Sequence, residues 1–340
     1  MLIIYTIITL LLSGQIKATD YTAIQKIAQS TSPTTITSSI VLGSRADGSE
    51  LRSPIRIVHS GNPGPVLSIF GAIHGDEITG TEIIRRISSN PSFSITTGTV
   101  YLIPVVNLPG FYQNLRYLPD RRDLNRTFPG SSNGSQAARL AYALIQFLKI
   151  SKTTVVVDLH SAATLRHNLP QIRATYSDGE LTEKLAQSFG TSVILNSSSV
   201  IDGSLRAYCK KSGIAYLLYE GGEASRIDET SVHVGVMGVY SVLDALGMKP
   251  PDPDIKSIQK EIFYSRKSFW VRATDSGILN SAKTSGDLVS EGETLGQITD
   301  LLGVKIGDIT SPQTGIIIGH VTNPILNAGD PIFHIAQPAK

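Results

Sequence analysis

Two histidines and a glutamate stand where apolar segments of this chain end, and these residue types bind metal ions. His74 and Glu77 lie three residues apart in a turn after the apolar run 66–70. His160 ends a second apolar run that begins at Val155. Ligands of parallel sheets bind at the carboxyl ends of the strands, so these three side chains are expected to converge there. A catalytic zinc takes three such protein ligands and one water molecule.

The His-x-x-Glu pair alone is a weak signal, because Glu77 would equally favour the positive end of a helix. Gly71 and Gly75 strengthen it, since glycine permits the tight turn and close backbone approach that a metal site needs. His160 alone could be an ordinary strand-end histidine, and Asp158 is expected to face away from it unless the strand ends first. Together the three ligands predict one zinc ion per chain, although cobalt or manganese suits the same set.

The segment after the expected strand at 100–106 is rich in guanidinium and amide groups. Its arginines, and the one just beyond it, are Arg116, Arg121, Arg122, Arg126 and Arg139. They form either a solvated loop or a carboxylate-binding group, since the planar guanidinium matches a carboxylate with two hydrogen bonds. Their place beside the predicted zinc favours carboxylate recognition.

A third apolar strand, expected at 214–219, leads directly to Glu220. A carboxylate at a strand end beside zinc is placed to accept a proton from an activated water molecule. Glu223, one short turn further on, is the alternative base. Position alone makes four other residues candidates for the site: Arg166, His167, Arg173 and Arg206.

Strand and helix patterns alternate through most of the chain. The expected strands are 66–71, 100–106, 154–159, 192–195 and 214–219, and the expected helices are 76–89, 135–150, 179–189, 204–212 and 229–247. Asp47 and Gly48 separate two strand-like runs before them and predict a hairpin. This order predicts an α/β domain with a mixed, largely parallel sheet flanked by helices.

The prolines in 250–253 end this pattern, and a β-rich, glycine-punctuated segment with a weak internal repeat follows. The repeat predicts a small all-β sandwich that resembles the barrel-sandwich fold of lipoyl and biotinyl domains. Lys305 lies near the position of the modified lysine in such domains, but its flanking residues differ, so a structural or substrate-covering role is expected. The expected boundaries are 1–18 for a signal peptide, 19–250 for a catalytic domain, 251–269 for a linker and 270–340 for the sandwich.

Composition describes an ordinary globular protein of 340 residues, with 41% hydrophobic and 17% charged residues. A net charge of +2 gives no indication of nucleic-acid binding, and the single cysteine, Cys209, excludes an intrachain disulfide or a cysteine-based metal site. The apolar run 2–12 before Ala18 resembles a secretory signal, although it lacks a basic residue; a buried first strand or helix is the alternative. We therefore expect export to the periplasm or beyond, without stable membrane insertion once the signal is removed, and a cytoplasmic protein otherwise.

These motifs resemble, in order, those of the succinylglutamate desuccinylase/aspartoacylase family. The matching residues are His74, Glu77, Asn107, Pro109, Arg116, Tyr117, Asp123, Leu124, Asn125, Arg126, Asp158, Leu159, His160 and Glu220. Members are zinc hydrolases with the metallocarboxypeptidase fold and a C-terminal β domain, so the resemblance covers most of 40–336.

The resemblance also implies a role for each matching side chain. The two histidines and Glu77 would hold zinc, and Glu220 would act as general base and then as general acid toward the leaving amine. Arg116 would polarise the scissile carbonyl. Asn125 and Arg126 would hold the α-carboxylate of the substrate. Asp123 would orient a ligand histidine.

The activity expected from these residues is a zinc-dependent amidohydrolase that removes an acyl group from an N-acyl amino acid or a similar small carboxylate. An exported zinc metallopeptidase, carboxypeptidase-like and acting on cell-wall peptides among others, would use the same residues. A non-enzymatic binding module built on the C-terminal sandwich is a third reading, which the complete set of ligands and base disfavours. The segment 118–122 is longer than its counterpart in the mammalian-type aspartoacylases, which leaves the preferred acyl group and amino acid open. The sequence does not indicate the oligomeric state.

Overall fold

The structure, a computed structural model, describes residues 24, 27, 30–45, 47–197, 199–249 and 261–339. Its strands are β1 (Thr34–Ser44), β2 (Glu50–His59), β3 (Val66–Gly71), β4 (Thr99–Ile103), β5 (Val155–His160), β6 (Arg166–Ala174), β7 (Val193–Asn196), β8 (Ala215–Gly222), β9 (Phe263–Ser265), β10 (Ser268–Arg272), β11 (Gly277–Ser281), β12 (Leu288–Val289), β13 (Thr294–Thr299), β14 (Lys305–Thr310), β15 (Gly315–Val321), β16 (Ile325–Leu326) and β17 (Pro331–Ala336). Its helices are α2 (Thr79–Ser89), α3 (Leu108–Gln113), α4 (Gln136–Ile150), α5 (Glu180–Ser188), α6 (Leu205–Lys211) and α7 (Glu229–Ala245), with short 3₁₀ turns η1 (Leu124–Arg126) and η2 (Tyr176–Asp178).

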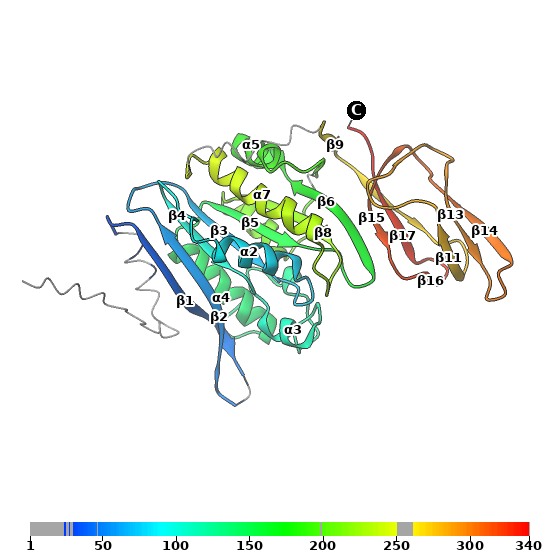
Figure 1. The fold of residues 1–340 in the computed structure, drawn as a ribbon. Coiled ribbons are helices and arrows are strands. Elements are labelled where there is room, and N and C mark those ends of the chain that lie inside the picture. Colours follow the sequence, from blue (N-terminus) through cyan, green and yellow to red (C-terminus); the bar gives the residue numbers. More distant parts are fainter. Residues whose placement is uncertain are drawn as a thin grey trace, which may run out of the picture.

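One mixed sheet runs through the molecule in the order β1-β2-β4-β3-β5-β8-β6-β15-β17-β10 (Figure 1). Strands β4, β3, β5 and β8 are parallel neighbours at its centre. Antiparallel β1 and β2 form the expected hairpin on one side, and β6 pairs antiparallel to β8 on the other. The predicted α/β domain with a mixed sheet is therefore confirmed, and each expected strand and helix has a counterpart.

Helices cover both faces of the central strands. Helices α2, α5 and α7 pack on one face, while α4 and α6 pack on the other (Figure 1). Within β3, Leu67 and Ile69 belong to the first core and Phe70 to the second. Successive residues of a strand point to opposite faces, so a strand covered on both sides reads as one continuous apolar run. This is why the central strands were readable in the sequence.

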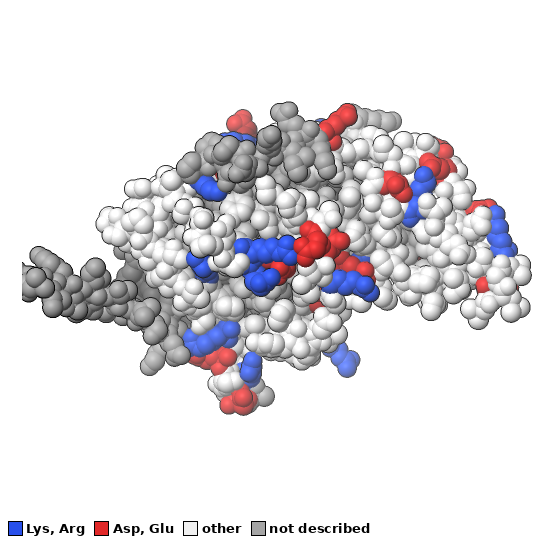
Figure 2. Space-filling model, in the orientation of Figure 1, with Lys and Arg blue, Asp and Glu red and all other residues white. Residues whose placement is uncertain are grey.

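Charged side chains of both signs lie together in a strip over α2 and α7 (Figure 2). On these two helices, Arg86 of α2 is 2.7 Å from Glu82 on its own helix and 2.8 Å from Glu229 at the start of α7. Such exposed pairs contribute about 0–1 kcal/mol each. The strip therefore links two helices without deciding the fold.

The C-terminal strands extend the sheet and add a second one. Strand β15 pairs with β6, and β17 and β10 follow it. A separate four-stranded sheet, β14-β13-β11-β16, shares a core with them that includes Leu295, Phe333 and Ile335. The weak sequence repeat corresponds to two similar three-strand units, β11–β13 and β15–β17. Of the expected linker, residues 261–269 include β9 and the start of β10, and 251–260 lie outside the described residues.

The described residues nearest the N-terminus, Ile24 and Ile27, are buried in the core beside α4. The expected signal peptide at 1–18 lies outside the described residues. No helix in the part of the chain that the structure describes is both long and apolar enough to span a bilayer.

Strand β6 had no counterpart among the sequence expectations. It contains Pro170 and does not alternate cleanly between apolar and polar residues, and proline within a run argues against a strand. Its register against β8 shifts between Asn168 and Gln171, so Pro170 lies within a bulge, where proline is tolerated.

The turn that presents His74 and Glu77 needs glycine for close packing. A Cβ on Gly71 would lie 2.6 Å from the carbonyl oxygen of Pro104, and one on Gly75 would overlap the backbone of Gly110. Neither glycine has a positive φ; in this turn Ala72 does, at 50°. The expected role of both glycines in close backbone approach is confirmed.

Replacing Gly75 with alanine should destabilise the fold by about 1–3 kcal/mol, because the new Cβ must displace backbone. The shifted turn should also weaken metal binding by His74 and Glu77. Chemical unfolding and metal titration measure the two effects. Gly43→Ala is the matched control, since a Cβ at Gly43 meets only a side-chain atom of Leu51, at 3.4 Å. Equal stability of the two variants would contradict this account.

Candidate active site

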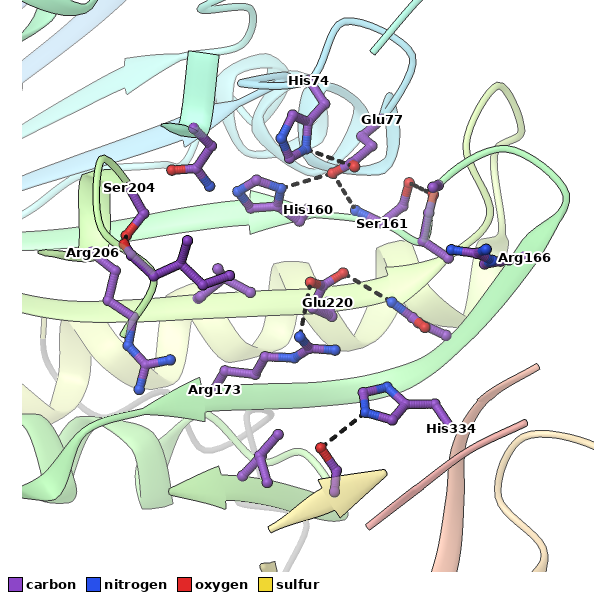
Figure 3. A pocket seen from close by; sticks show the side chains of 18 of the residues that line it. His74, Glu77, His160, Ser161, Arg166, Arg173, Ser204, Arg206, Glu220 and His334 are labelled. Carbon is purple, nitrogen blue, oxygen red and sulfur yellow. Dashed lines mark hydrogen bonds and ion pairs between the residues drawn. The ribbon is translucent and has the colours of Figure 1, made fainter. Parts of the chain in front are cut away.

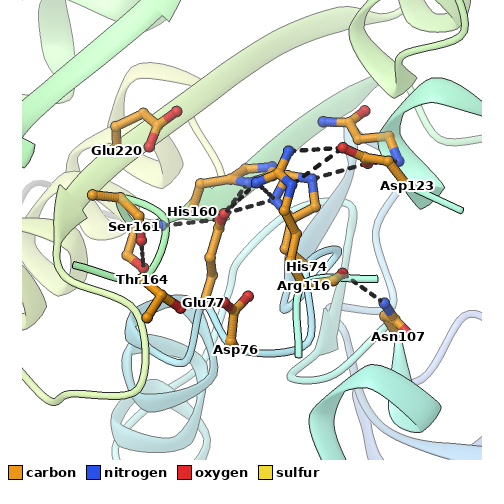
Figure 4. Close-up of polar contacts among 12 residues, drawn as sticks. His74, Asp76, Glu77, Asn107, Arg116, Asp123, His160, Ser161, Thr164 and Glu220 are labelled. Atoms are coloured by element: carbon orange, nitrogen blue, oxygen red, sulfur yellow. Dashed lines mark hydrogen bonds and ion pairs between the residues drawn. The ribbon is translucent and has the colours of Figure 1, made fainter. Parts of the chain in front are cut away.

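His74, Glu77 and His160 meet at the carboxyl ends of β3 and β5. Nδ1 of His74 lies 2.7 Å from Oε1 of Glu77, and Nδ1 of His160 lies 2.7 Å from Oε2 of the same carboxylate (Figure 4). One ligand atom from each residue falls within 4.8 Å of the others, and all three residues are buried. The structure thus brings together the three residues that the sequence predicted as metal ligands, in an arrangement that could hold one ion.

Each imidazole has a second carboxylate at its outer nitrogen. Oδ1 of Asp123 lies 3.2 Å from Nε2 of His74, and Oδ2 of Asp158 lies 3.1 Å from Nε2 of His160. The expectation that Asp158 faces away from His160 is wrong. Residues two apart in a strand share a face, so both side chains of β5 point to the same side. Tyr216 donates a hydrogen bond of 2.6 Å to Oδ2 of Asp158 and fixes that carboxylate.

Charges inside this buried cluster are mutually stabilising. Burial raises the pKa of the Glu77 carboxyl, but the two imidazoles outweigh burial and hold that pKa far below its usual range. Burial lowers the pKa of both imidazoles, but Glu77 and Asp123 raise the pKa of His74 above its ordinary value, and Asp158 and Glu77 raise that of His160 further. The cluster therefore favours an ionised Glu77 carboxylate, a group that would also stabilise a bound cation.

Arg116, in the loop after α3, lies beside the cluster. It donates to Oδ2 of Asp123 from Nε at 3.2 Å and from Nη2 at 2.8 Å, and its Nη1 lies 3.1 Å from Oε1 of Glu77 (Figure 4). Asp123 is also the cap of η1, where it accepts from the backbone nitrogen of Asn125 at 2.8 Å. One carboxylate thus aligns a histidine, an arginine and the turn that carries the next two predicted site residues.

Asn125 and Arg126, both in η1, line the cavity in front of the cluster. Oδ1 of Asn125 accepts from the backbone nitrogen of Leu205 at 2.9 Å, which leaves its amide nitrogen as the donor group. Nη1 of Arg126 donates to the carbonyl oxygen of Asn125 at 2.7 Å. The structure therefore places both residues at the site, on the side of α6.

Glu220 lies within β8, and in the parallel register it stands directly beside His160. Its side chain enters the cavity between the histidine cluster and Arg173 (Figure 3). Oε2 accepts from Nδ2 of Asn168 at 2.9 Å, and Oε1 lies 3.9 Å from Nη1 of Arg173. Glu223, the alternative base, instead accepts from the hydroxyl of Thr322 at 3.0 Å, and it does not line this cavity.

The cavity has a volume of about 440 Å³, and many of its lining side chains are positively charged. Its arginines are Arg116, Arg126, Arg166, Arg173 and Arg206, and its carboxylates are Glu77 and Glu220. Arg121, Arg122 and Arg139 are not among its lining residues. Of the four positional candidates, the three arginines reach the cavity, whereas His167 is not among its lining residues and lies tilted against His320, with 5.5 Å between ring centres.

The far wall of the cavity comes from the C-terminal strands, whose expected role was structural or substrate-covering, but the sequence identified none of the residues in this wall as site residues. Ser268 and Trp270 of β10 and His334 of β17 line it. The indole of Trp270 stacks on the imidazole of His334, with 4.6 Å between ring centres and 10° between ring planes. The guanidinium of Arg166 lies over the Trp270 ring, 5.3 Å from its centre. Burial, reinforced by Arg173 and Arg166, lowers the pKa of His334 to about 3. His334 is therefore a neutral part of this wall.

Residues 63–246 match the model of the succinylglutamate desuccinylase/aspartoacylase catalytic domain. The chain is 24% identical over 299 residues to the N-alpha-acetyl-L-2,4-diaminobutyric acid deacetylase of Halomonas elongata, covering 84% of this chain and 85% of that protein. A succinylglutamate desuccinylase/aspartoacylase structure from Rhodobacter sphaeroides superposes with a TM-score of 0.78 at 23% identity, covering 91% and 96% of the two chains. The product-bound structure of the ectoine utilization protein EutE (DoeB) from Ruegeria pomeroyi superposes with a TM-score of 0.78 at 19% identity, covering 89% of this chain and 95% of that one.

Asp158→Asn should weaken zinc binding by about 10- to 100-fold, because the carboxylate that aligns His160 loses its charge. Competition with a chromophoric chelator measures the affinity. Asp308→Asn, at an exposed pair with Lys305 in β14, is the remote control and should bind zinc like the wild type. Unchanged affinity in the Asp158 variant would show that Asp158 does not support the ligand.

Proposed function

Because this chain belongs to the succinylglutamate desuccinylase/aspartoacylase family, we propose that it is a zinc-dependent amidohydrolase that removes an acyl group from an N-acyl amino acid. The observation that carries the proposal is the shared cavity, which contains the His/Glu/His cluster, Glu220 and a set of arginines. A metal-binding cluster, a base and anion-binding groups are the parts that hydrolysis of such an amide requires.

His74, Glu77 and His160 are the residues that would hold zinc. Two imidazoles and one carboxylate are a catalytic zinc ligand set. Asp123 and Asp158 lie at the outer nitrogens of the two histidines and give them the carboxylate support that is typical of zinc-bound imidazoles. When bound, zinc supplies Lewis-acid activation of water and of the scissile carbonyl.

Glu220 would take a proton from the attacking water molecule and return it to the leaving amine. Its position beside His160, with its carboxylate in the cavity, supports this role. Arg116 would stabilise negative charge on the carbonyl oxygen. Its bonds to Asp123 use Nε and Nη2, and Nη1 donates to Glu77; a guanidinium has five N–H donors, so a second N–H of Nη2 remains for the substrate. Asn125 and Arg126 would hold the α-carboxylate.

The charge of the cavity favours a substrate with a second anionic group. Among the described residues, no carboxylate lies in ion-pair range of Arg126, Arg166 or Arg206. The two carboxylates of the cavity are already engaged, Glu77 by the histidines and Glu220 by Asn168. The Halomonas elongata relative is named for an acyl amino acid with a side-chain amine, which this cavity offers no free carboxylate to receive. We therefore propose N-acyl dicarboxylic amino acids as the substrate class.

The finer domain assignments are part of this proposal. Residues 270–340 would form a barrel-sandwich domain that closes the far side of the cavity, after a catalytic domain ending near residue 250. The shared core of the two C-terminal sheets and the cavity wall at Trp270 and His334 support this arrangement. Removal of residues 1–18 as an export signal is proposed from the sequence alone.

Glu220→Gln should lower kcat by about 10²- to 10⁴-fold, because the amide cannot accept the proton. Zinc content should stay at that of the wild type, since Glu220 is not a proposed ligand. Steady-state kinetics and metal analysis of the same preparation test both statements. Wild-type protein stripped with a chelator should lose activity and regain it with zinc. Full activity in the Gln variant would overturn the base assignment.

Substrate preference should follow the charge of the cavity. We expect N-acetylaspartate, N-acetylglutamate or N-succinylglutamate to exceed N-acetyl-2,4-diaminobutyrate in kcat/KM by at least about 10-fold, as one lost charged contact is worth about 1.5–3 kcal/mol. Arg206→Gln should reduce this preference. Amine release from a panel that also contains short peptides is the measurement. Preference for the diaminobutyrate would refute the substrate class, and cleavage of peptides alone would indicate a metallopeptidase.

A further inference from the structure

Glu220 is held in place by a strand that the catalytic motifs do not include. Its Oε2 accepts a hydrogen bond of 2.9 Å from the side-chain amide of Asn168 on β6. Asn168 is buried and lines the same cavity. Arg173, further along β6, lies 3.9 Å from the other carboxylate oxygen. The two oxygens of the carboxylate therefore face two different residues of one neighbouring strand.

The bulge in β6 makes this arrangement possible. Asn168 and Arg173 are five positions apart, so in a regular strand they would point to opposite faces of the sheet. The register against β8 shifts by one residue between Asn168 and Gln171. A bulge of this kind redirects a side chain, and bulges are frequent beside active sites. Here it brings both residues to the face that carries Glu220.

Strand β15 of the C-terminal region closes the other side of Asn168. Gly319 is its register partner in the antiparallel β6–β15 pairing. A Cβ on Gly319 would lie 2.5 Å from Oδ1 of Asn168 and 3.3 Å from the carbonyl oxygen of His167. Gly319 therefore leaves the space that the amide of Asn168 occupies while it donates to Glu220.

We propose that Asn168 is a positioning residue that fixes the orientation of the Glu220 carboxylate, and that Gly319 of the C-terminal region keeps Asn168 in place. The inference rests on the proposed function, in which Glu220 is the general base. It gives the C-terminal strands a part in catalysis that is separate from covering the substrate. The base is then held from two sides, by its own strand and by a strand that the C-terminal region supports.

Asn168→Ala should lower kcat by about 10- to 100-fold, the scale of loss for a misplaced catalytic group, with KM within about twofold of the wild type. Asn168→Asp keeps the size of the side chain but replaces the donor with an acceptor, so its kcat should be no higher than that of Asn168→Ala. Zinc content and thermal stability of each variant exclude loss of the metal or of the fold. Near wild-type kcat in both variants would overturn the proposal.

Gly319→Ala should reproduce the kcat loss of Asn168→Ala, because the added methyl group displaces the amide. Gly307→Ala is the matched control: Gly307 lies in a strand of the same region, and a Cβ there would have its nearest neighbour at 3.4 Å. The control should keep the wild-type kcat. A Gly319 variant as active as the Gly307 variant would remove β15 from the proposal.

A double-mutant cycle separates positioning from a general structural effect. If Asn168 acts through Glu220, Asn168→Ala should change the residual activity of Glu220→Gln by less than about twofold, because coupled residues are not additive. Full additivity would overturn the positioning role. A fully active Glu220→Gln protein would instead refute the general base of the proposed function. If Glu220→Gln is inactive but Asn168→Ala keeps the wild-type kcat, only the positioning role of Asn168 is refuted.

Discussion

The carboxylate of Glu77, buried between two imidazoles, is the interaction on which this site depends. An isolated buried charge costs several kcal/mol, so the fold must surround it with partners. His74 and His160 lie 2.7 Å from its two oxygens, and Asp123 and Asp158 lie at their outer nitrogens. This chain of alternating charge needs two neighbouring strand ends and a tight glycine turn, because one element alone could not supply all of its members.

The sheet meets this requirement through its register. Strands β3 and β5 are parallel neighbours, so the turn after Gly71 opens beside the end of β5 at His160. The next strand, β8, pairs with β5 so that Glu220 stands directly opposite His160. A proposed metal ligand, His160, and the proposed base, Glu220, are thus adjacent across one strand pair. Binding at the carboxyl ends of parallel strands is the general behaviour of such sheets, and here it determines which side chains can share a cavity.

The C-terminal strands belong to the site as well as to their own core. Through β15 they pair with β6, and through β10 and β17 they place Trp270 and His334 on the cavity wall. Arg166 of β6 lies over Trp270, so the two parts of the chain interact through a stacked cation and aromatic group. The cavity is lined by both parts of the chain, whereas the His/Glu/His cluster comes entirely from the α/β part.

The sequence by itself determined the α/β architecture, the C-terminal β repeat and the identity of the three residues that meet in the cluster. These follow from local pattern: doubly buried strands read as apolar runs, and their ends mark the edge where a site forms. The tertiary structure alone decided which other residues join them. Strand β6, with its proline and bulge, has no clear period, and Asn168 reaches Glu220 only because that bulge turns it. Trp270 and His334 lie 50 and 114 residues beyond Glu220 and reach the cavity only through strand pairing. Contacts between distant strands depend on register and bulges, which no local pattern in this sequence encodes.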